Sequence, residues 1–328
     1  MLDTKESVLA STIAEIERRF GAGTMKFASE IKAADLDYIS TGSMALDYAM
    51  GGGFPRRKIT VLYGDYSVGK STMCLYGCAS AQKEGHTAAF MKMENWLPPD
   101  YAKALGVDMD RLLVVQSVEK NQVSGEQVLA IAENLMRSGV PIVVVDSIPA
   151  LIPQRQIESD IGDKNYAAIA ALLSDTLKKL SDAADYGNSA LVFTSQVRQT
   201  IGAKAYHGYQ PVHMYGGKAI LHYSDIIVKL TRQLDKETRE EQQVVRAIVE
   251  KNRLNVPQRE AEFTLEYGKG VDHVAEVFDT AVDKGVIKDS GSGRFGYNDT
   301  KWRGRDKVLQ SLRENTELRD EIEKEVRK

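Results

Sequence analysis

The sequence is poor in cysteine, in tryptophan and in long hydrophobic runs. It holds two cysteines and two tryptophans among 328 residues, and no apolar stretch approaches the roughly 18 residues that indicate a membrane-spanning helix. The first twenty residues, MLDTKESVLASTIAEIERRF, carry charges throughout, unlike a secretory signal peptide. These absences argue against a membrane-spanning or disulfide-stabilised secreted protein, and we expect a cytoplasmic one.

Excess charge of one sign is also missing. The formal net charge is −3, which argues against a globally basic nucleic-acid binder but leaves local basic patches open. Cys74 and Cys78 lie four residues apart, so on a helix they share a face. This spacing favours small core residues over a disulfide or a metal site.

Short apolar runs alternate with helical patterns from residue 39 onward. We expect strands at 58–63, 86–94, 111–117, 141–147 and 189–196, and helices at 70–83, 100–106, 125–139 and 165–184. Such alternation predicts an α/β fold with a mostly parallel twisted sheet and helices on both faces. The segments 224–234, 242–254 and 261–268 follow one another without a helix between them, and we expect antiparallel strands at one sheet edge.

The chain divides into three expected parts. Residues 1–32 form an N-terminal helix and linker, whose apolar stripe docks either on a neighbouring subunit or on the chain's own core. Residues 33–268 form the core. Residues 269–328 form a small C-terminal α/β domain, with helices around a turn or hairpin at GRFGYND.

The stretch GDYSVGKST, at 64–72, has the spacing of a phosphate-binding loop between a strand and a helix. Its glycines let successive N–H groups face the phosphates. We expect Lys70 to reach the β and γ phosphates and Ser71 to ligate Mg²⁺. The expected nucleotide contacts of the loop are Gly64, Asp65, Tyr66, Ser67, Val68, Gly69, Lys70, Ser71 and Thr72.

Three further polar residues end or follow other expected strands. Asp146 ends PIVVVDS and is the natural partner of Mg²⁺. Glu94 ends FMKME and is placed to orient and deprotonate the attacking water. Gln196 ends LVFTSQ, where its amide would sense the γ-phosphate. Together with the loop, these residues predict an ATP-hydrolysing site.

Several longer strings resemble the bacterial RecA recombinases. They are YISTGSMALDYAMGGGFPRRKITVLYGDYSVGKST, IVVVDS with IPALIP, LVFTSQVR, and KNRLNVPQREAEFTLEYGKG. The likeness runs in order over nearly the whole chain. It implies a RecA-like P-loop NTPase core and a DNA-dependent ATPase with ATP and Mg²⁺. Such a protein forms helical filaments on single-stranded DNA and exchanges strands with homologous duplex DNA in recombination and repair.

The resemblance also implies residue roles. Lys70, Glu94 and Gln196 act in catalysis, Ser71 and Asp146 hold the metal, and Tyr101 stacks on adenine. Lys251 and Arg253 reach the ATP of the adjacent subunit and play the role of an arginine finger there.

A long segment without a clear period, 197–216, follows Gln196 and mixes cations with tyrosines, which suits single-strand binding. The resemblance places the mobile DNA-binding loop here and a second one at 157–167. The DNA-binding residues that we expect are Tyr166, Ser174, Lys178, Arg198, Lys204, Gly216, Gly217 and Lys218.

Some positions depart from the family pattern. The phosphate loop reads DYSV instead of a proline with small residues, and Arg253 and His222 replace a lysine and an interface phenylalanine. Lys92 replaces an acid two residues before Glu94 and, on a strand, would share its face and pair with it. These departures are typical of a divergent member, such as one borne by a phage or another mobile genome.

Two other functions remain open at this point. A hexameric helicase or translocase shares the phosphate loop, Glu94 and Asp146, but leaves the N-terminal helix and the KNRL pair less well explained. A non-catalytic, ATP-gated DNA scaffold is the second alternative, because Lys92 lies beside the expected catalytic carboxylate.

Overall fold

The structure, a computed structural model, describes residues 2–22, 24–25, 36–94, 97–116, 123–157, 166–199, 212–233 and 241–326. It separates into two units, residues 1–36 and residues 37–328. The first unit holds helix α1 (Leu2–Phe20). Val8, Leu9 and Phe20 on this helix are at least half exposed, so its apolar stripe is open to solvent.

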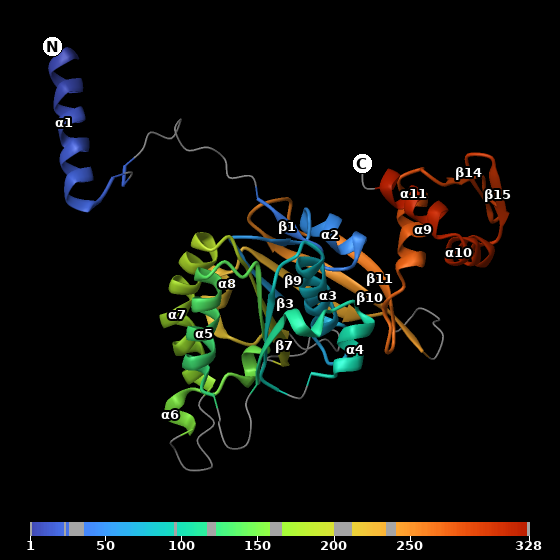
Figure 1. The fold of residues 1–328 in the computed structure, drawn as a ribbon, viewed down its shortest axis with the longest axis horizontal. Helices are drawn as coiled ribbons and strands as arrows, with labels where there is room; N and C mark the ends of the chain where they lie inside the picture. The colour runs from blue at the N-terminus through green and yellow to red at the C-terminus, as the bar shows by residue number, and fades with distance from the viewer. Residues whose placement is uncertain are drawn as a thin grey trace. The chain divides into compact units, whose positions relative to one another are not determined.

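One large sheet organises the second unit (Figure 1). Its strand order is β12-β11-β10-β9-β3-β7-β6-β4-β5, and β8 pairs with β7. The strands from β9 to β5 in this order run parallel, whereas β10, β11 and β12 add to the edge as antiparallel strands. The bounds are β3 Ile59–Gly64, β4 Ala88–Lys92, β5 Leu112–Gln116, β6 Ile142–Asp146, β7 Ala190–Gln199, β8 Val212–Met214, β9 Ile226–Arg232, β10 Gln242–Asn252, β11 Glu260–Glu266 and β12 Gly270–Val271.

Helices cover both faces of this sheet, as the sequence predicts. α5 (Gly125–Arg137), α7 (Tyr166–Tyr186) and α8 (Gly217–Tyr223) lie on one face, and α3 (Lys70–Lys83) lies on the other (Figure 1). Strand β3 contributes Ile59 and Val61 to the core under α5 and α7, and Leu62 to the core under α3. Both faces of the strand are therefore buried, which explains its lack of polar alternation. The α/β fold class is confirmed.

Smaller elements frame the core. They are β1 Tyr38–Ile39, α2 Met44–Met50, β2 Phe54–Pro55, α4 Pro99–Ala104, a 3-10 turn at Met109–Arg111, another at Ile148–Ala150, and α6 Gln154–Ile157. Cys74 and Cys78 are free thiols buried in the core on α3, and burial raises the pKa of Cys78 to about 12. Their packing fits the interpretation as core residues.

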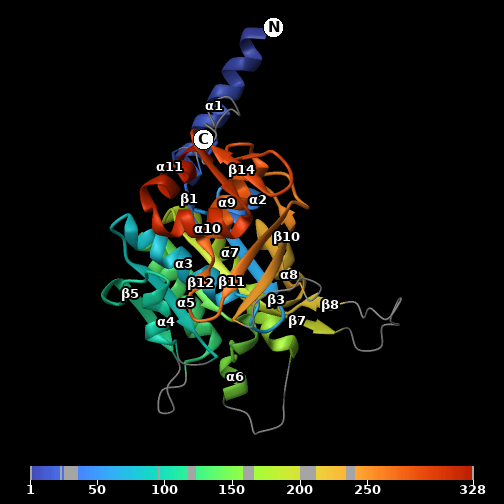
Figure 2. The ribbon, with the colours of Figure 1, turned by 90° about the vertical axis from the view of Figure 1, so that its right-hand side faces the viewer.

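The C-terminal part combines a small sheet with three helices (Figure 2). β13 (Lys288–Asp289), β14 (Arg294–Tyr297) and β15 (Thr300–Arg303) pair antiparallel, where the sequence predicts only a turn or hairpin. The helices are α9 His273–Asp283, α10 Arg305–Glu314 and α11 Thr316–Val326. Glu276 on α9 joins this part to the core, because its buried carboxylate accepts hydrogen bonds from Ser43 Oγ and from the Ala45 N–H.

Within the described residues, no helix is both long and apolar enough to cross a membrane.

Candidate functional site

The phosphate loop connects β3 to α3, at the edge of the sheet where the parallel strands end. A Cβ on Gly64 would lie 2.1 Å from the carbonyl oxygen of Leu230, and Gly69 has φ of +89° as it caps α3. Both positions therefore require glycine. The loop presents the N-terminus of α3, whose free N–H groups favour bound phosphate.

Lys70 lies within this loop. Its Nζ donates hydrogen bonds to the carbonyl oxygens of Gly64, at 2.9 Å, and Asp65, at 2.5 Å. Burial lowers the pKa of Lys70, while the charges of Asp146 and Glu94 oppose that shift. Two carbonyl oxygens of the loop thus hold the ammonium group within the expected phosphate-binding loop.

A hollow of about 470 Å³ opens beside the loop. Tyr101, on α4, lines it, and its hydroxyl pairs with Thr72 Oγ1 at 2.8 Å. Burial raises the pKa of Tyr101. The opposite wall, which sequence reasoning missed, consists of Gln243, Leu265, Glu266, Tyr267 and Gly268. Gln243 lies on β10 and Leu265 and Glu266 end β11, two and three strands away from β3 in the sheet. Only the sheet topology therefore brings these residues to the loop.

Asp146 is almost fully buried at the end of β6. Its Oδ2 accepts hydrogen bonds from Ser71 Oγ at 2.8 Å and from Lys92 Nζ at 2.6 Å, and its Oδ1 accepts one from Thr194 Oγ1 at 2.5 Å. A hydroxyl and a carboxylate oxygen are hard ligands, and Mg²⁺ takes few protein ligands and keeps several waters. Ser71 and Asp146 therefore fit this ion. The described part of the chain holds no cluster of three or more His, Cys, Asp or Glu side chains that could bind a metal by themselves.

Lys92 pairs with Asp146 and not with Glu94, so the expected pairing is wrong. β4 ends at Lys92, and the alternation of side chains along a strand no longer applies two residues later. Instead, the parallel register sets Lys92 opposite Asp146.

Glu94 and Gln196 meet near the same edge. Gln196 Nε2 donates to Glu94 Oε1 at 3.0 Å, and Ser147 Oγ donates to the same oxygen. Glu94 itself is exposed, which leaves its carboxylate open to water. Since β4, β6 and β7 are parallel neighbours, their carboxyl ends bring Glu94, Asp146 and Gln196 together, as sequence reasoning expects.

Lys251 and Arg253 lie at and just beyond the end of β10, away from the phosphate loop. Lys251 Nζ donates to the Leu221 carbonyl at 2.5 Å, and an Arg253 NH2 donates to the His222 carbonyl at 2.6 Å. Both cations thus cap the C-terminus of α8, where the helix dipole favours positive charge. Burial and the neighbouring Arg253 lower the pKa of Lys251.

The model of the RecA N-terminal domain matches residues 7–272, and that of the RecA C-terminal domain matches residues 275–328. The chain belongs to the RecA family. It is 38% identical to Protein RecA of Clostridioides difficile (strain 630), over 98% of this chain and 92% of that protein. It is 41% identical to Protein RecA of Chlorobaculum parvum, over 96% and 90%, and 39% identical to that of Caulobacter vibrioides, over 99% and 90%.

Membership of the RecA family confirms the function that the resemblance predicts. RecA proteins are DNA-dependent ATPases that use ATP and Mg²⁺, form filaments on single-stranded DNA and carry out strand exchange. The chain is therefore a recombinase, and neither the hexameric helicase nor the non-catalytic scaffold is supported.

Most of the expected DNA-binding residues lie on α7 and at the start of α8, and another lies on β7. Ser174 and Lys178 are exposed on α7, where Lys178 forms an ion pair with Asp182. Gly216 and Gly217, both with positive φ, begin α8, and a Cβ on Gly217 would lie 2.9 Å from the Cβ of Ala170 on α7. Lys218, the next residue on α8, is exposed. Tyr166 begins α7 and Arg198 lies on β7, whereas Lys204 and most of both expected loops lie outside the described residues.

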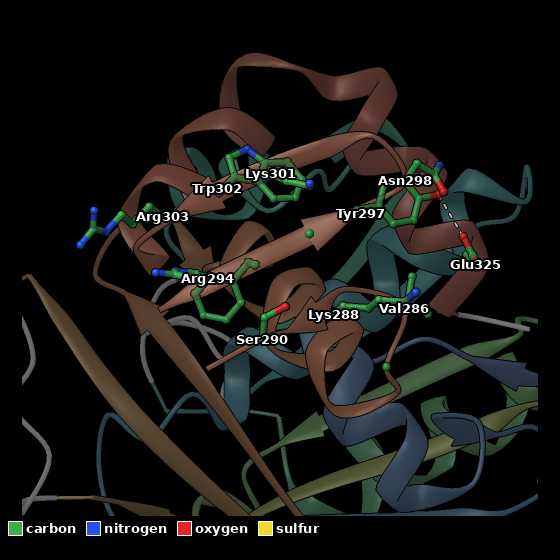
Figure 3. Close-up of a pocket in the computed structure, with 13 residues that line it drawn as sticks. Val286, Lys288, Ser290, Arg294, Tyr297, Asn298, Lys301, Trp302, Arg303 and Glu325 are labelled. Atoms are coloured by element: carbon green, nitrogen blue, oxygen red, sulfur yellow. Dashed lines mark hydrogen bonds between the residues drawn. The ribbon is translucent and has the colours of Figure 1, made fainter. Parts of the chain in front are cut away.

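A hollow of about 900 Å³ lies over the small C-terminal sheet (Figure 3). Lys288, Arg294, Lys301 and Arg303 line it together with Trp302, which makes the surface basic and partly aromatic. Such a surface suits phosphate groups. Sequence reasoning did not single out these cations, because they come from three different short strands and gather only when the sheet forms.

Proposed function

We propose that this chain hydrolyses ATP in the hollow beside the phosphate loop, with the residues of that loop and of three strand ends in separate roles. Residues 64–72 bind the phosphates, with Lys70 on the β and γ groups, and Tyr101 stacks on adenine. Ser71 and Asp146 hold Mg²⁺, which neutralises charge on the phosphates when it is bound. Glu94 orients the attacking water and accepts its proton.

Gln196 couples this site to DNA. The observation that carries the proposal is the 3.0 Å hydrogen bond between Gln196 Nε2 and Glu94 Oε1. Gln196 lies on β7, which continues to Gln199 and leads into residues 200–211. A γ-phosphate at Glu94 competes for the Gln196 amide, so nucleotide binding changes the contacts of the strand that precedes the DNA-binding segment.

Removal of this amide tests the proposal. Gln196→Ala is expected to bind ATP with nearly unchanged affinity, because Gln196 does not hold the loop or the hollow. It is expected to lose the increase in single-stranded DNA affinity that ATP produces, measured by fluorescence anisotropy of a labelled oligonucleotide with and without nucleotide. Gln310→Ala, on the remote helix α10, is the matched control. An ATP-dependent gain of DNA affinity retained in Gln196→Ala would reject the relay.

The remaining residues act between subunits and on DNA. We assign residues 1–32 to polymerisation, residues 33–268 to the ATPase core and residues 269–328 to the C-terminal domain. Lys251 and Arg253 reach the ATP of the next subunit once they release the carbonyls of α8. The DNA contacts are Tyr166, Ser174, Lys178, Arg198, Lys204, Gly216, Gly217 and Lys218. The DNA substrate and the two buried free thiols support a cytoplasmic location.

A further inference from the structure

Lys92 places a positive charge directly on the expected magnesium ligand. Its Nζ lies 2.6 Å from Asp146 Oδ2, and the two side chains are only 11% and 5% exposed. The same oxygen accepts the Ser71 hydroxyl at 2.8 Å. Lys92 and Ser71, the other expected protein ligand of Mg²⁺, therefore donate to the same oxygen of Asp146.

The surroundings hold this ammonium in place. Lys92 is the last residue of β4, a strand paired on both sides with β5 and β6, so its backbone is fixed by the sheet. Asp146 is fixed in turn by Thr194. A buried, hydrogen-bonded pair of this kind is costly to break, because either partner alone would be an uncompensated buried charge.

The pair changes the charge that Mg²⁺ meets. A buried carboxylate attracts a divalent cation strongly in a site of low effective dielectric constant. Lys92 cancels the charge of Asp146, so the protein's own attraction for the ion falls. Without Lys92, the unpaired carboxylate of Asp146 would repel the polyphosphate, so the paired ammonium favours nucleotide binding in the absence of metal.

We propose that Lys92 is a built-in cation of the ATP site that lowers its dependence on Mg²⁺. It tightens the binding of metal-free ATP and weakens the additional affinity that Mg²⁺ supplies. The inference rests on the proposed nucleotide site and concerns a positioning charge, not a residue that takes part in the reaction itself.

The test is a thermodynamic cycle between Mg²⁺ and nucleotide. Affinity for a fluorescent, non-hydrolysable ATP analogue is measured in EDTA and at increasing Mg²⁺ for the wild type, Lys92→Met, Lys92→Gln and Lys92→Arg. The Met and Gln variants are expected to bind metal-free analogue more weakly, and to gain at least about tenfold more affinity from Mg²⁺ than the wild type does. Lys92→Arg keeps the charge and is expected to follow the wild type. Lys83→Met, at the exposed end of α3, is the control.

Two outcomes would reject the role of Lys92, and a third would reject the nucleotide site itself. Equal Mg²⁺ enhancement in the wild type, Lys92→Met and Lys92→Gln overturns the role of Lys92. A loss of thermal stability in these variants with unchanged Mg²⁺ enhancement also overturns it, because the pair is then only structural. A wild type that does not bind the analogue at all rejects the nucleotide site itself, which separates the failure of the proposed function from that of the inference.

Discussion

Lys70 shows how burial sets the properties of a single residue. In the free protein, burial lowers its pKa, so the ammonium loses its proton at a lower pH than an ordinary lysine, whose pKa is about 10.4. A bound triphosphate favours the charged form and reverses that shift. We therefore expect ATP affinity to fall as the pH rises through the lowered pKa, and ATP binding in this alkaline range to take up protons.

Calorimetry in two buffers with different ionisation enthalpies measures this proton uptake. Lys70→Arg is the matched variant, since arginine stays charged throughout the range, and its binding is expected to take up no proton. Wild-type binding whose enthalpy is the same in both buffers at alkaline pH would contradict the assignment of Lys70 to the phosphates.

Glu94 carries the second prediction at this scale. Glu94→Gln keeps the shape and the hydrogen-bond acceptor for Gln196 but removes the base, so DNA-stimulated ATP hydrolysis is expected to fall by about 10²- to 10⁴-fold. ATP binding is expected to persist and the DNA-bound filament to accumulate. Steady-state phosphate release and filter binding to single-stranded DNA measure the two effects. Turnover at the wild-type rate would remove Glu94 from catalysis.

The contacts of a single residue were predictable where a short motif fixes its backbone. They were less predictable where the end of a strand determines which neighbour the side chain meets. GDYSVGKST defines a loop between a strand and a helix with the glycine conformations that the motif predicts, and the contact of Lys70 with phosphates stays a prediction. The partner of Lys92 was not predictable, because the local pattern favoured a strand through Glu94, whereas β4 ends two residues earlier. The register between β4 and β6, a long-range property, chose Asp146 instead.

At the scale of elements, hydrogen bonds join the end of β10 to the C-terminus of α8. Arg253 donates to the His222 carbonyl in the single chain and is exposed, so little of the chain's own nucleotide site depends on it. Arg253→Ala is expected to abolish DNA-stimulated hydrolysis while changing nucleotide affinity less than about twofold, because arginine fingers act on the transition state.

Phosphate release with and without single-stranded DNA, together with nucleotide titration, measures these two effects. Arg246→Ala, on the same strand and with its guanidinium paired to Glu260, is the control. A fall in nucleotide affinity as large as the fall in hydrolysis would place Arg253 inside its own subunit's site and contradict the interface assignment.

The bounds of elements with strong periodicity were predictable to within a few residues. Short elements that are stable only when packed on one another were not predictable. The helix expected at 70–83 begins and ends as predicted, and Gly69 caps its N-terminus. The C-terminal sheet was missed as a sheet because its strands are two to four residues long and are stable only when packed together. The wall of the nucleotide hollow at 265–268 was missed because strand order, not sequence, brings it to the loop.

At the scale of the whole molecule, the exposed apolar surface of α1 and the proposed contact of Lys251 and Arg253 with a neighbour's ATP both concern assembly. Val8, Leu9 and Phe20 leave an apolar stripe exposed on α1, and such a stripe is typical of an interaction surface. The α/β architecture followed from the alternation of strands and helices. The filament followed only from the resemblance to the RecA family, because the apolar stripe of the N-terminal helix fits docking on the chain's own core as well as on a neighbouring subunit.

Electron microscopy with a non-hydrolysable ATP analogue, with and without single-stranded DNA, tests the central claim most directly. We expect helical filaments when analogue and DNA are both present, and their loss when Ile16→Asp, in the C-terminal third of α1, puts a charge into the apolar stripe. Closed rings or isolated single chains under the same conditions would contradict the assignment of this chain as a filament-forming recombinase.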